Sequence, residues 1–347
     1  MRIGFLLERP NYRRIFGPIM AAAVRRGWEV IEAFDGDCDV AVALRPPSRH
    51  RPFALVGLQY TLDLGGLIDS FGETPFQRLA IASEYWREHA SEAVRIIAGM
   101  RGVKAVHGDA IQSAVKDAAI VGSPWLDQTH HLPPAAVLRK YGLPNDRPLV
   151  IYFPFPFHSN PKTFWTRWYR VAGERKIARA IRAFCDANGA ALVAKCRDKD
   201  PASAAVRRIA DFIIYDPTFY PATSLELLSV ASLAIHYHST VAYEAAYMKV
   251  PSLCLTTDHK RLGFPAEWSA WFLSETPHSG FNWRGVVYLL DMVTATTELP
   301  HRRLRDFAID GAERDRYVER FVGPDDGRAS ECVLDVASSA AAAGYRI

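Results

Sequence analysis

Long apolar runs are missing from this sequence. No stretch approaches the ~18 consecutive apolar residues that a transmembrane helix needs, and the N-terminal apolar stretch already ends at Glu8. A secretory signal peptide would carry a longer apolar region and a small-residue cleavage site. Cysteine is also scarce: the five residues are scattered, and none forms a CxxC pair. We therefore expect a cytoplasmic protein whose thiols are reduced and fill the core.

Several familiar motifs are absent as well. No GxGxxG follows the first apolar segment, and there is no GxxxxGK(S/T), GxSxG or HExxH. These absences argue against the usual dinucleotide site, a P-loop, a serine-hydrolase elbow and a zinc protease. His236 and His238 lie two residues apart, but no third ligand stands at a suitable spacing. The sequence predicts no metal and no cofactor.

Charge of one sign does not dominate either. The chain has 42 basic and 38 acidic residues, a net charge of +4, which is too small to indicate a nucleic-acid partner. Of its 347 residues, 49% are hydrophobic and 23% are charged, as in ordinary globular proteins. This length predicts two domains, each with a sizeable core.

Short apolar runs alternate with segments of helical periodicity, which is typical of an α/β fold. In the first half we expect a helix over 13–26, helical sequence near Gln77 and over 84–100, and strands over 2–7, 28–34, 39–44, 53–60, 103–107 and 118–121. Turn-forming residues over 141–148 predict a linker, after which the pattern restarts.

In the second half we expect helices over 177–187, 223–230 and 240–248, and strands over 149–153, 191–195, 212–215, 233–236 and 252–256. Thr223 and Glu226 have the spacing of a capping box, and 303–346 is mostly helical. The domains are predicted as 1–142, 148–323 and a C-terminal helix over 324–347. Two successive Rossmann-like domains imply a cleft between them, lined by loops that follow strands.

One segment carries most of the chemical information. A strand ends at His236, and a turn of His238, Ser239 and Thr240 then opens a helix. Free N–H groups of a first helical turn, with two hydroxyls beside them, suit a phosphate. Glu244 lies one turn further and could accept hydrogen bonds from a ribose diol. The alternative is an N-capped helix with a solvated glutamate.

This segment resembles the donor-nucleotide signature of GT-B glycosyltransferases and of the related CDP-glycerol glycerophosphotransferases. Other stretches follow in the family order: Val121–Asp127 resembles "TG-x-P-x-x-D", Leu192–Lys195 resembles the "lviK-x-H" strand, and Asp325–Ser330 resembles "DG-x-(A/S)-x-R". Arg197 stands where the family often has histidine. The resemblance extends from about residue 118 to the end, and it implies two Rossmann-like domains, the second of which binds the donor.

The resemblance also implies roles for the neighbouring loops. Lys195 and Arg197 follow a strand and could neutralise a diphosphate leaving group, although a solvated basic loop explains them equally well. The loop over 216–221, with Asp216 and Thr218, is placed at the donor site because such loops commonly touch the nucleobase in this family.

An inverting transferase also needs a base near the acceptor hydroxyl. In GT-B proteins the N-terminal domain supplies it. Asp63, just beyond the fourth expected strand, is our first candidate, and Glu8 at the end of the first strand is our second. Tyr60 replaces the histidine that the glycerophosphotransferases carry near this position, which counts against that assignment and leaves the base open.

Together these features predict a metal-independent glycosyltransferase. It would move a sugar from a nucleotide-activated donor to a glycan, lipid-linked or small-molecule acceptor. A lipid-linked acceptor would bring the protein to the inner membrane face as a peripheral protein. The alternatives are a CDP-glycerol glycerophosphotransferase, an isomerase like the UDP-sugar 2-epimerases, and a non-catalytic nucleotide-sugar-binding protein. The epimerase needs an Arg-Pro-Glu-type motif where this chain has Lys249–Ser252.

Overall fold

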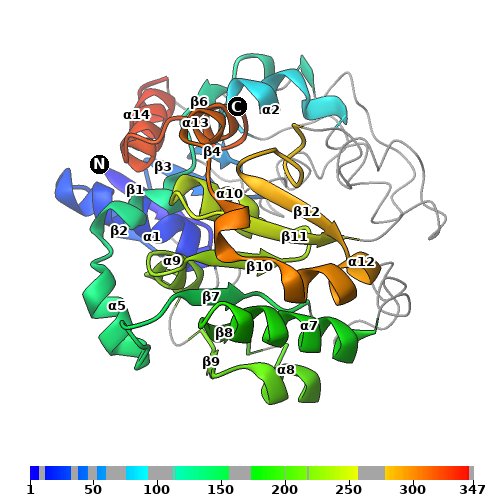
Figure 1. The fold of residues 1–347 in the computed structure, drawn as a ribbon. Coiled ribbons are helices and arrows are strands. Elements are labelled where there is room, and N and C mark those ends of the chain that lie inside the picture. Colours follow the sequence, from blue (N-terminus) through cyan, green and yellow to red (C-terminus); the bar gives the residue numbers. More distant parts are fainter. Residues whose placement is uncertain are drawn as a thin grey trace. The chain divides into compact units, whose positions relative to one another are not determined.

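The computed structural model describes residues 1–7, 12–32, 38–45, 53–59, 76–92, 112–113, 115–155, 173–198, 200–216, 219–256 and 278–343. Packing divides the chain into two units (Figure 1). The first comprises Met1–His130, Phe219–Pro221 and Val318–Ile347, and the second comprises His131–Thr218 and Ala222–Tyr317. Each unit has its own six-stranded sheet in which every strand pair is parallel. The predicted α/β class with two Rossmann-like domains is confirmed.

The sheet of the first unit has the strand order β2-β1-β3-β4-β5-β6. Its strands are β1 (Arg2–Phe5), β2 (Glu29–Ile31), β3 (Val40–Ala43), β4 (Ala54–Leu58), β5 (Arg78–Ile81) and β6 (Ala119–Ile120). Its helices are α1 (Arg13–Arg25), α2 (Glu84–Glu88), the 3₁₀ helix η2 (Pro124–His131) and α14 (Ala329–Ala342). The central strands are buried on both faces, which explains their near-continuous apolar sequences.

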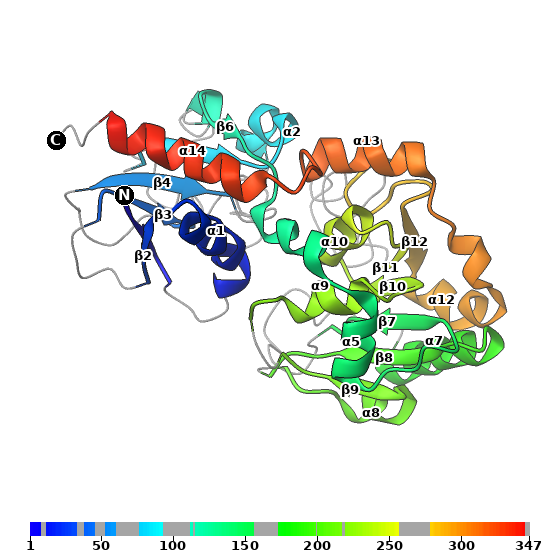
Figure 2. The same ribbon diagram turned by 90° about the vertical axis from the view of Figure 1, so that its left-hand side faces the viewer.

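Helices α1 and α14 cover one face of this sheet side by side (Figure 2). Their buried side chains, among them Phe16, Ile19, Val333 and Leu334, share one apolar cluster with β1, β3 and β4. The last helix of the chain therefore completes the core that the first strand begins.

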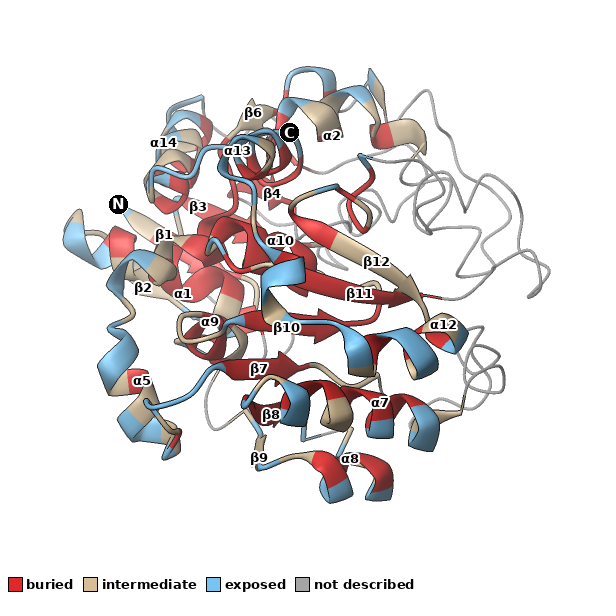
Figure 3. Cartoon of the chain, viewed as in Figure 1, coloured by how far each residue is buried: buried red, intermediate tan, exposed pale blue. Residues whose placement is uncertain are grey.

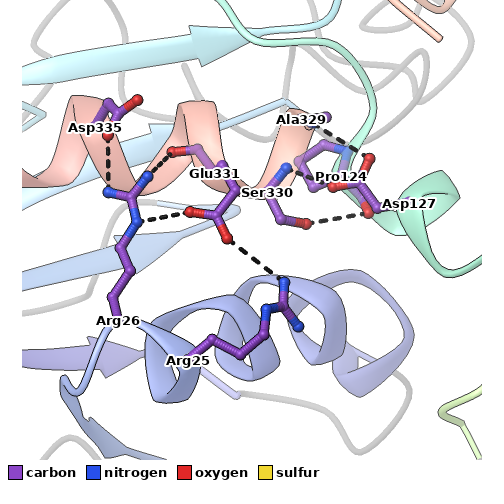
Figure 4. A network of polar contacts seen from close by, with 8 residues as sticks. All are labelled: Arg25, Arg26, Pro124, Asp127, Ala329, Ser330, Glu331 and Asp335. Carbon is purple, nitrogen blue, oxygen red and sulfur yellow. Dashed lines mark hydrogen bonds and ion pairs between the residues drawn. The ribbon is translucent and has the colours of Figure 1, made fainter. Parts of the chain in front are cut away.

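Polar contacts hold α14 in place at two points (Figure 4). Arg26, directly after α1, donates to the carboxylates of Glu331 at 2.6 Å and Asp335 at 2.7 Å. At the start of α14 the Asp127 carboxylate accepts the N–H groups of Ala329 at 3.3 Å and Ser330 at 2.6 Å. Asp127 thus supplies from η2 the cap that Arg328, the residue before the helix, does not provide.

The sheet of the second unit has the strand order β12-β11-β10-β7-β8-β9. Its strands are β7 (Leu149–Tyr152), β8 (Ala191–Lys195), β9 (Phe212–Ile214), β10 (Leu233–His236), β11 (Ser252–Thr256) and β12 (Val287–Asp291). Its helices are α5 (Pro134–Tyr141), α7 (Glu174–Ala187), α8 (Ala204–Ile209), α9 (Thr223–Leu228), α10 (Val241–Tyr247) and α12 (Met292–Glu298), with the 3₁₀ turns η5 (Leu299–His301) and η6 (Leu304–Phe307). Helix α13 (Gly311–Phe321) begins in this unit and ends in the first.

Alternate strand residues face opposite helix layers in the second unit. Val150, Leu192 and Ile235 belong to the cluster packed under α7, α8 and α12, whereas Ile151 and Val193 pack toward α9. Figure 3 shows these strands buried, while the outer faces of α7, α8 and α12 are exposed. Both faces of the sheet are therefore packed against helices, so a ligand would bind at the ends of the strands.

Three sequence predictions were wrong in detail. The helical sequence expected near Gln77 precedes a strand, β5, whose residues are buried on both faces apart from its first. Thr223 and Glu226 form no capping box: Ala222 is the residue before α9, and the Glu226 carboxylate instead accepts hydrogen bonds from Lys140 and Tyr141 of α5. Strand β12 was not predicted at all. The strand expected over 103–107 lies outside the described residues.

Among the described helices, none combines the length and the apolar character that crossing a membrane requires.

Candidate functional site

The strand order of the second sheet reverses next to β7. Chain order runs outward from β7 through β8 to β9, and then returns to β10 on the other side of β7. In open α/β sheets, ligands bind beyond the carboxyl ends of the strands at such a reversal. The loop that follows β10, with His238, Ser239 and Thr240, lies at this point. The structure therefore brings the predicted donor loop to the position where the topology favours a ligand.

His238 turns the chain away from β10. Its φ of +30° is unusual for a residue with a side chain. Its backbone N–H donates to the Sγ atom of Cys254 on β11 at 3.4 Å, and its Nε2 lies 3.5 Å from the Thr256 hydroxyl. The Phe281 ring packs edge-on against the imidazole at 5.1 Å. Burial raises the pKa of the Cys254 thiol to about 12, so Cys254 acts here as a neutral acceptor.

Ser239 and Thr240 are half-buried, and some of their N–H groups form no hydrogen bond with the described residues. The Val241 N–H reaches the Ser239 hydroxyl at 3.4 Å, but the N–H groups of Ser239 and Thr240 have no partner among the described residues. Glu244 lies on α10 and is buried, with 7% of its surface exposed. The loop thus offers hydroxyl and amide donors with a carboxylate one turn beyond them.

Lys195 and Asp216 meet at the same edge of the sheet. Lys195 is the last residue of β8, and Asp216 follows the end of β9 by two residues. The Lys195 Nζ atom lies 2.7 Å from Asp216 Oδ2, and their side chains are only 10% and 18% exposed. Strand β7 alone separates β8 from β10. The backbone of Lys195 at the end of β8 therefore lies about 10 Å from the end of β10, where the His238 loop starts.

Arg197 has a different environment. Its guanidinium pairs with Asp200 at 2.7 Å and its side chain is 47% exposed. Each of the two described cations of the predicted phosphate clamp therefore already has an acidic partner. Thr218, the other predicted residue of the 216–221 loop, lies outside the described residues.

Side chains of α13 hold α10 in place. The buried Arg314 guanidinium donates to the carbonyls of Ala246 at 2.8 Å and Tyr247 at 2.6 Å, at the end of α10 opposite the loop. Tyr243 stacks on Tyr317 with ring centroids 5.8 Å apart. These contacts hold α10, and hence Glu244, against the sheet.

His236, the last residue of β10, is fully buried, and neither ring nitrogen has a hydrogen-bond partner within the part of the chain that the structure describes. Burial lowers its pKa to about 3, so the imidazole is neutral at physiological pH. Although His238 is only two residues away, it is half-buried and lies in the loop. The two histidines therefore have different surroundings, and among the described residues no group of three His, Cys, Asp or Glu side chains is placed to hold a metal.

Both candidates for the catalytic base, Glu8 and Asp63, lie outside the described residues. Glu8 belongs to the segment after β1, and β1 and β3 flank the point where the strand order of the first sheet reverses. Sequence reasoning missed the supports of the loop, namely Cys254, Thr256, Phe281 and Arg314. No local pattern could have revealed them, because each acts across a gap in the sequence.

No family model matches the sequence, and no match is found among curated proteins. The three-dimensional structure, in contrast, is similar to solved structures. The wall teichoic acid polymerase TagF superposes with a TM-score of 0.60 at 13% identity, covering 99% of this chain and 89% of that chain. The chain has the two-domain GT-B fold.

Other GT-B structures match over their whole length. The UDP-GlcNAc 2-epimerase from Neisseria meningitidis, bound to UDP-GlcNAc, superposes with a TM-score of 0.52 at 11% identity, covering 98% of this chain and 100% of that chain. The epimerase from Methanocaldococcus jannaschii gives 0.50 at 12% identity with the same coverage. At these identities the likeness concerns the GT-B fold, which the donor-signature resemblance predicted.

Proposed function

We propose that this protein is a metal-independent GT-B transferase that uses a nucleotide-activated sugar donor. The observation that carries the proposal is the position of the His238–Thr240 loop at the strand-order reversal of the second sheet. The donor's phosphates would accept hydrogen bonds from the amides and hydroxyls of Ser239 and Thr240, with the Lys195 ammonium facing them. Donors aimed at a departing phosphate stabilise the charge that develops when the glycosidic bond breaks.

Glu244 would accept hydrogen bonds from the ribose hydroxyls. A buried carboxylate is well suited to this role, because hydrogen bonds to an ionised acceptor in a poorly solvated site are strong and directional. Arg197 and Thr218 would complete the donor side, and Asp216 would lie beside it, paired with Lys195. The acceptor, a glycan or a lipid-linked sugar, would be activated by a base of the first unit, with Asp63 and Glu8 as the candidates.

The first test is calorimetric titration with UDP, CDP, GDP, ADP, TDP and CMP. A nucleotide at 100 times its dissociation constant should also stabilise the fold by ~2.7 kcal/mol. We expect one nucleotide to bind, and Glu244→Gln and Ser239→Ala to weaken it at least tenfold. Ser224→Ala, which removes a half-buried hydroxyl from α9 in the same unit, is the matched control and should bind normally.

The second test distinguishes the reactions. Acceptor-dependent release of the nucleotide from a sugar donor supports the glycosyltransferase, and release of CMP from CDP-glycerol indicates a glycerophosphotransferase. Interconversion of UDP-GlcNAc with its 2-epimer would identify an isomerase instead. Binding without turnover would leave a nucleotide-sugar-binding protein, and failure of every nucleotide to bind would refute the proposal.

A further inference from the structure

We propose that Asp216 is an internal competitor for the donor's phosphate and thereby sets the affinity of the site. This inference rests on the proposed function, because it concerns the group that Lys195 must receive. The Lys195 ammonium is paired with the Asp216 carboxylate at 2.7 Å, and the pair is largely shielded from water. A phosphate that binds Lys195 meets a cation whose charge is already neutralised.

The backbones of Lys195 and of Ile214, two residues before Asp216, are fixed relative to each other. Strands β8 and β9 are paired in parallel with Lys195 opposite Ile214, and the Cys196 N–H donates to the Ile214 carbonyl at 2.8 Å. The pair can separate by movement of the Lys195 side chain. Lysine is suited to this, because its ammonium is a point charge on a flexible four-carbon stem and can turn from one oxygen to another.

A phosphate that joins the existing pair gains less than one that binds a free ammonium. The ammonium has two further N–H donors, and two acceptors held by one ammonium at hydrogen-bond distance lie about 4.5 Å apart. A carboxylate and a phosphate at that separation repel each other, and screening is weak in a site that is mostly buried. This repulsion offsets part of the attraction to Lys195, so the phosphate binds most tightly when Asp216 moves away, and the free energy of separating the pair is then subtracted from the binding free energy.

The alternative role for Asp216 is to position Lys195 for the ligand, and the two roles predict opposite signs. If Asp216 competes, Asp216→Asn frees the ammonium and tightens binding. If Asp216 positions Lys195 or contacts the ligand itself, the same change weakens binding. The isosteric substitution keeps the shape of the side chain and removes only its charge.

The experiment is calorimetric titration of UDP and of inorganic pyrophosphate into wild type, Asp216→Asn, Lys195→Met and the double variant, at fixed ionic strength. We expect Asp216→Asn to tighten both ligands about tenfold, which is the usual worth of a charge-assisted hydrogen bond. In the Lys195→Met background the same change should have little effect, because the competition acts through Lys195.

Asp186→Asn is the matched control for net charge. Asp186 pairs with Arg182 at the exposed end of α7, and its side chain is 65% exposed. This variant should bind both ligands as wild type does. Unchanged or weaker binding in Asp216→Asn, with binding intact in wild type, overturns the inference and leaves the proposed function standing. A tenfold gain that persists without Lys195 also overturns it, and so does absence of UDP and pyrophosphate binding in every variant. The proposed function itself falls only if none of the six nucleotides binds.

Discussion

The buried imidazole of His236 makes the stability of the second unit depend on pH. Burial lowers its pKa from the ordinary value of 6.5 to about 3 in the folded chain. The folded protein therefore keeps His236 neutral while the unfolded chain binds a proton below pH 6.5. Stability is lost as the pH falls from 6.5 toward 3, because protonation then favours the unfolded state.

The size of this effect follows from the two pKa values. At pH 5 the unfolded histidine is almost fully protonated and the folded one is not. Linkage then predicts that the free energy of unfolding is about 2 kcal/mol lower at pH 5 than at pH 7.5 through this one group. His236→Leu should remove that contribution. It should also raise stability at pH 7.5, since no described residue forms a hydrogen bond with the imidazole that would compensate its burial.

The measurement is urea denaturation of both proteins at a series of pH values between 5 and 7.5. Ser252→Ala is the control, because Ser252 is a buried hydroxyl on the neighbouring strand that does not titrate in this range. Its pH dependence should follow that of wild type. If the His236→Leu curve is parallel to that of wild type, His236 titrates in the folded protein as it does in the unfolded chain, and the reasoning fails.

Three further predictions follow from packing and hydrogen bonds. Arg314→Met should lower the free energy of unfolding by about 3 kcal/mol, because two buried carbonyls lose charge-assisted hydrogen bonds. The control is Arg316→Met, at a side chain that is 70% exposed, which should change the free energy of unfolding by less than about 0.5 kcal/mol. Equal losses for the two variants in urea denaturation would refute this reasoning. Asp127→Ala should lower the free energy of unfolding by about 1 kcal/mol, because α14 loses its N-terminal cap. Urea denaturation measures this as well, and an unchanged free energy of unfolding would show that water replaces the carboxylate. Gly17→Ala should destabilise α1, although alanine usually favours helices, because the new Cβ would lie 2.6 Å from the Tyr220 ring. In a double-mutant cycle, Tyr220→Ala should recover part of the lost stability. If the effects of the two substitutions are additive, the contact between them is contradicted.

Much of the fold was readable from local patterns. The alternation of apolar runs and helical segments predicted two parallel sheets, since strands buried on both faces must be apolar throughout. The errors arose where local signals mislead. Thr223 and Glu226 have the spacing of a cap, but Glu226 makes stronger charged contacts with Lys140 and Tyr141 of another helix. Strand β5 begins with the exposed Arg78, and only three buried residues follow it, too few to distinguish a strand from a helix by periodicity.

The sequence by itself determined which groups the predicted donor loop can offer, because hydroxyls, amides and a carboxylate one turn later follow from the order of residues at His238–Glu244. The roles of Lys195, Arg197, Asp216 and Thr218 stay predictions that binding experiments must test. Only the tertiary structure decided what surrounds these groups. The strand order reverses at β7, β11 and Phe281 hold His238, and β9 carries Asp216 to Lys195. The contacts of His238 and Lys195 join residues 16 to 43 positions apart in the sequence, and such pairings arise from the packing of whole strands rather than from any local preference of the chain.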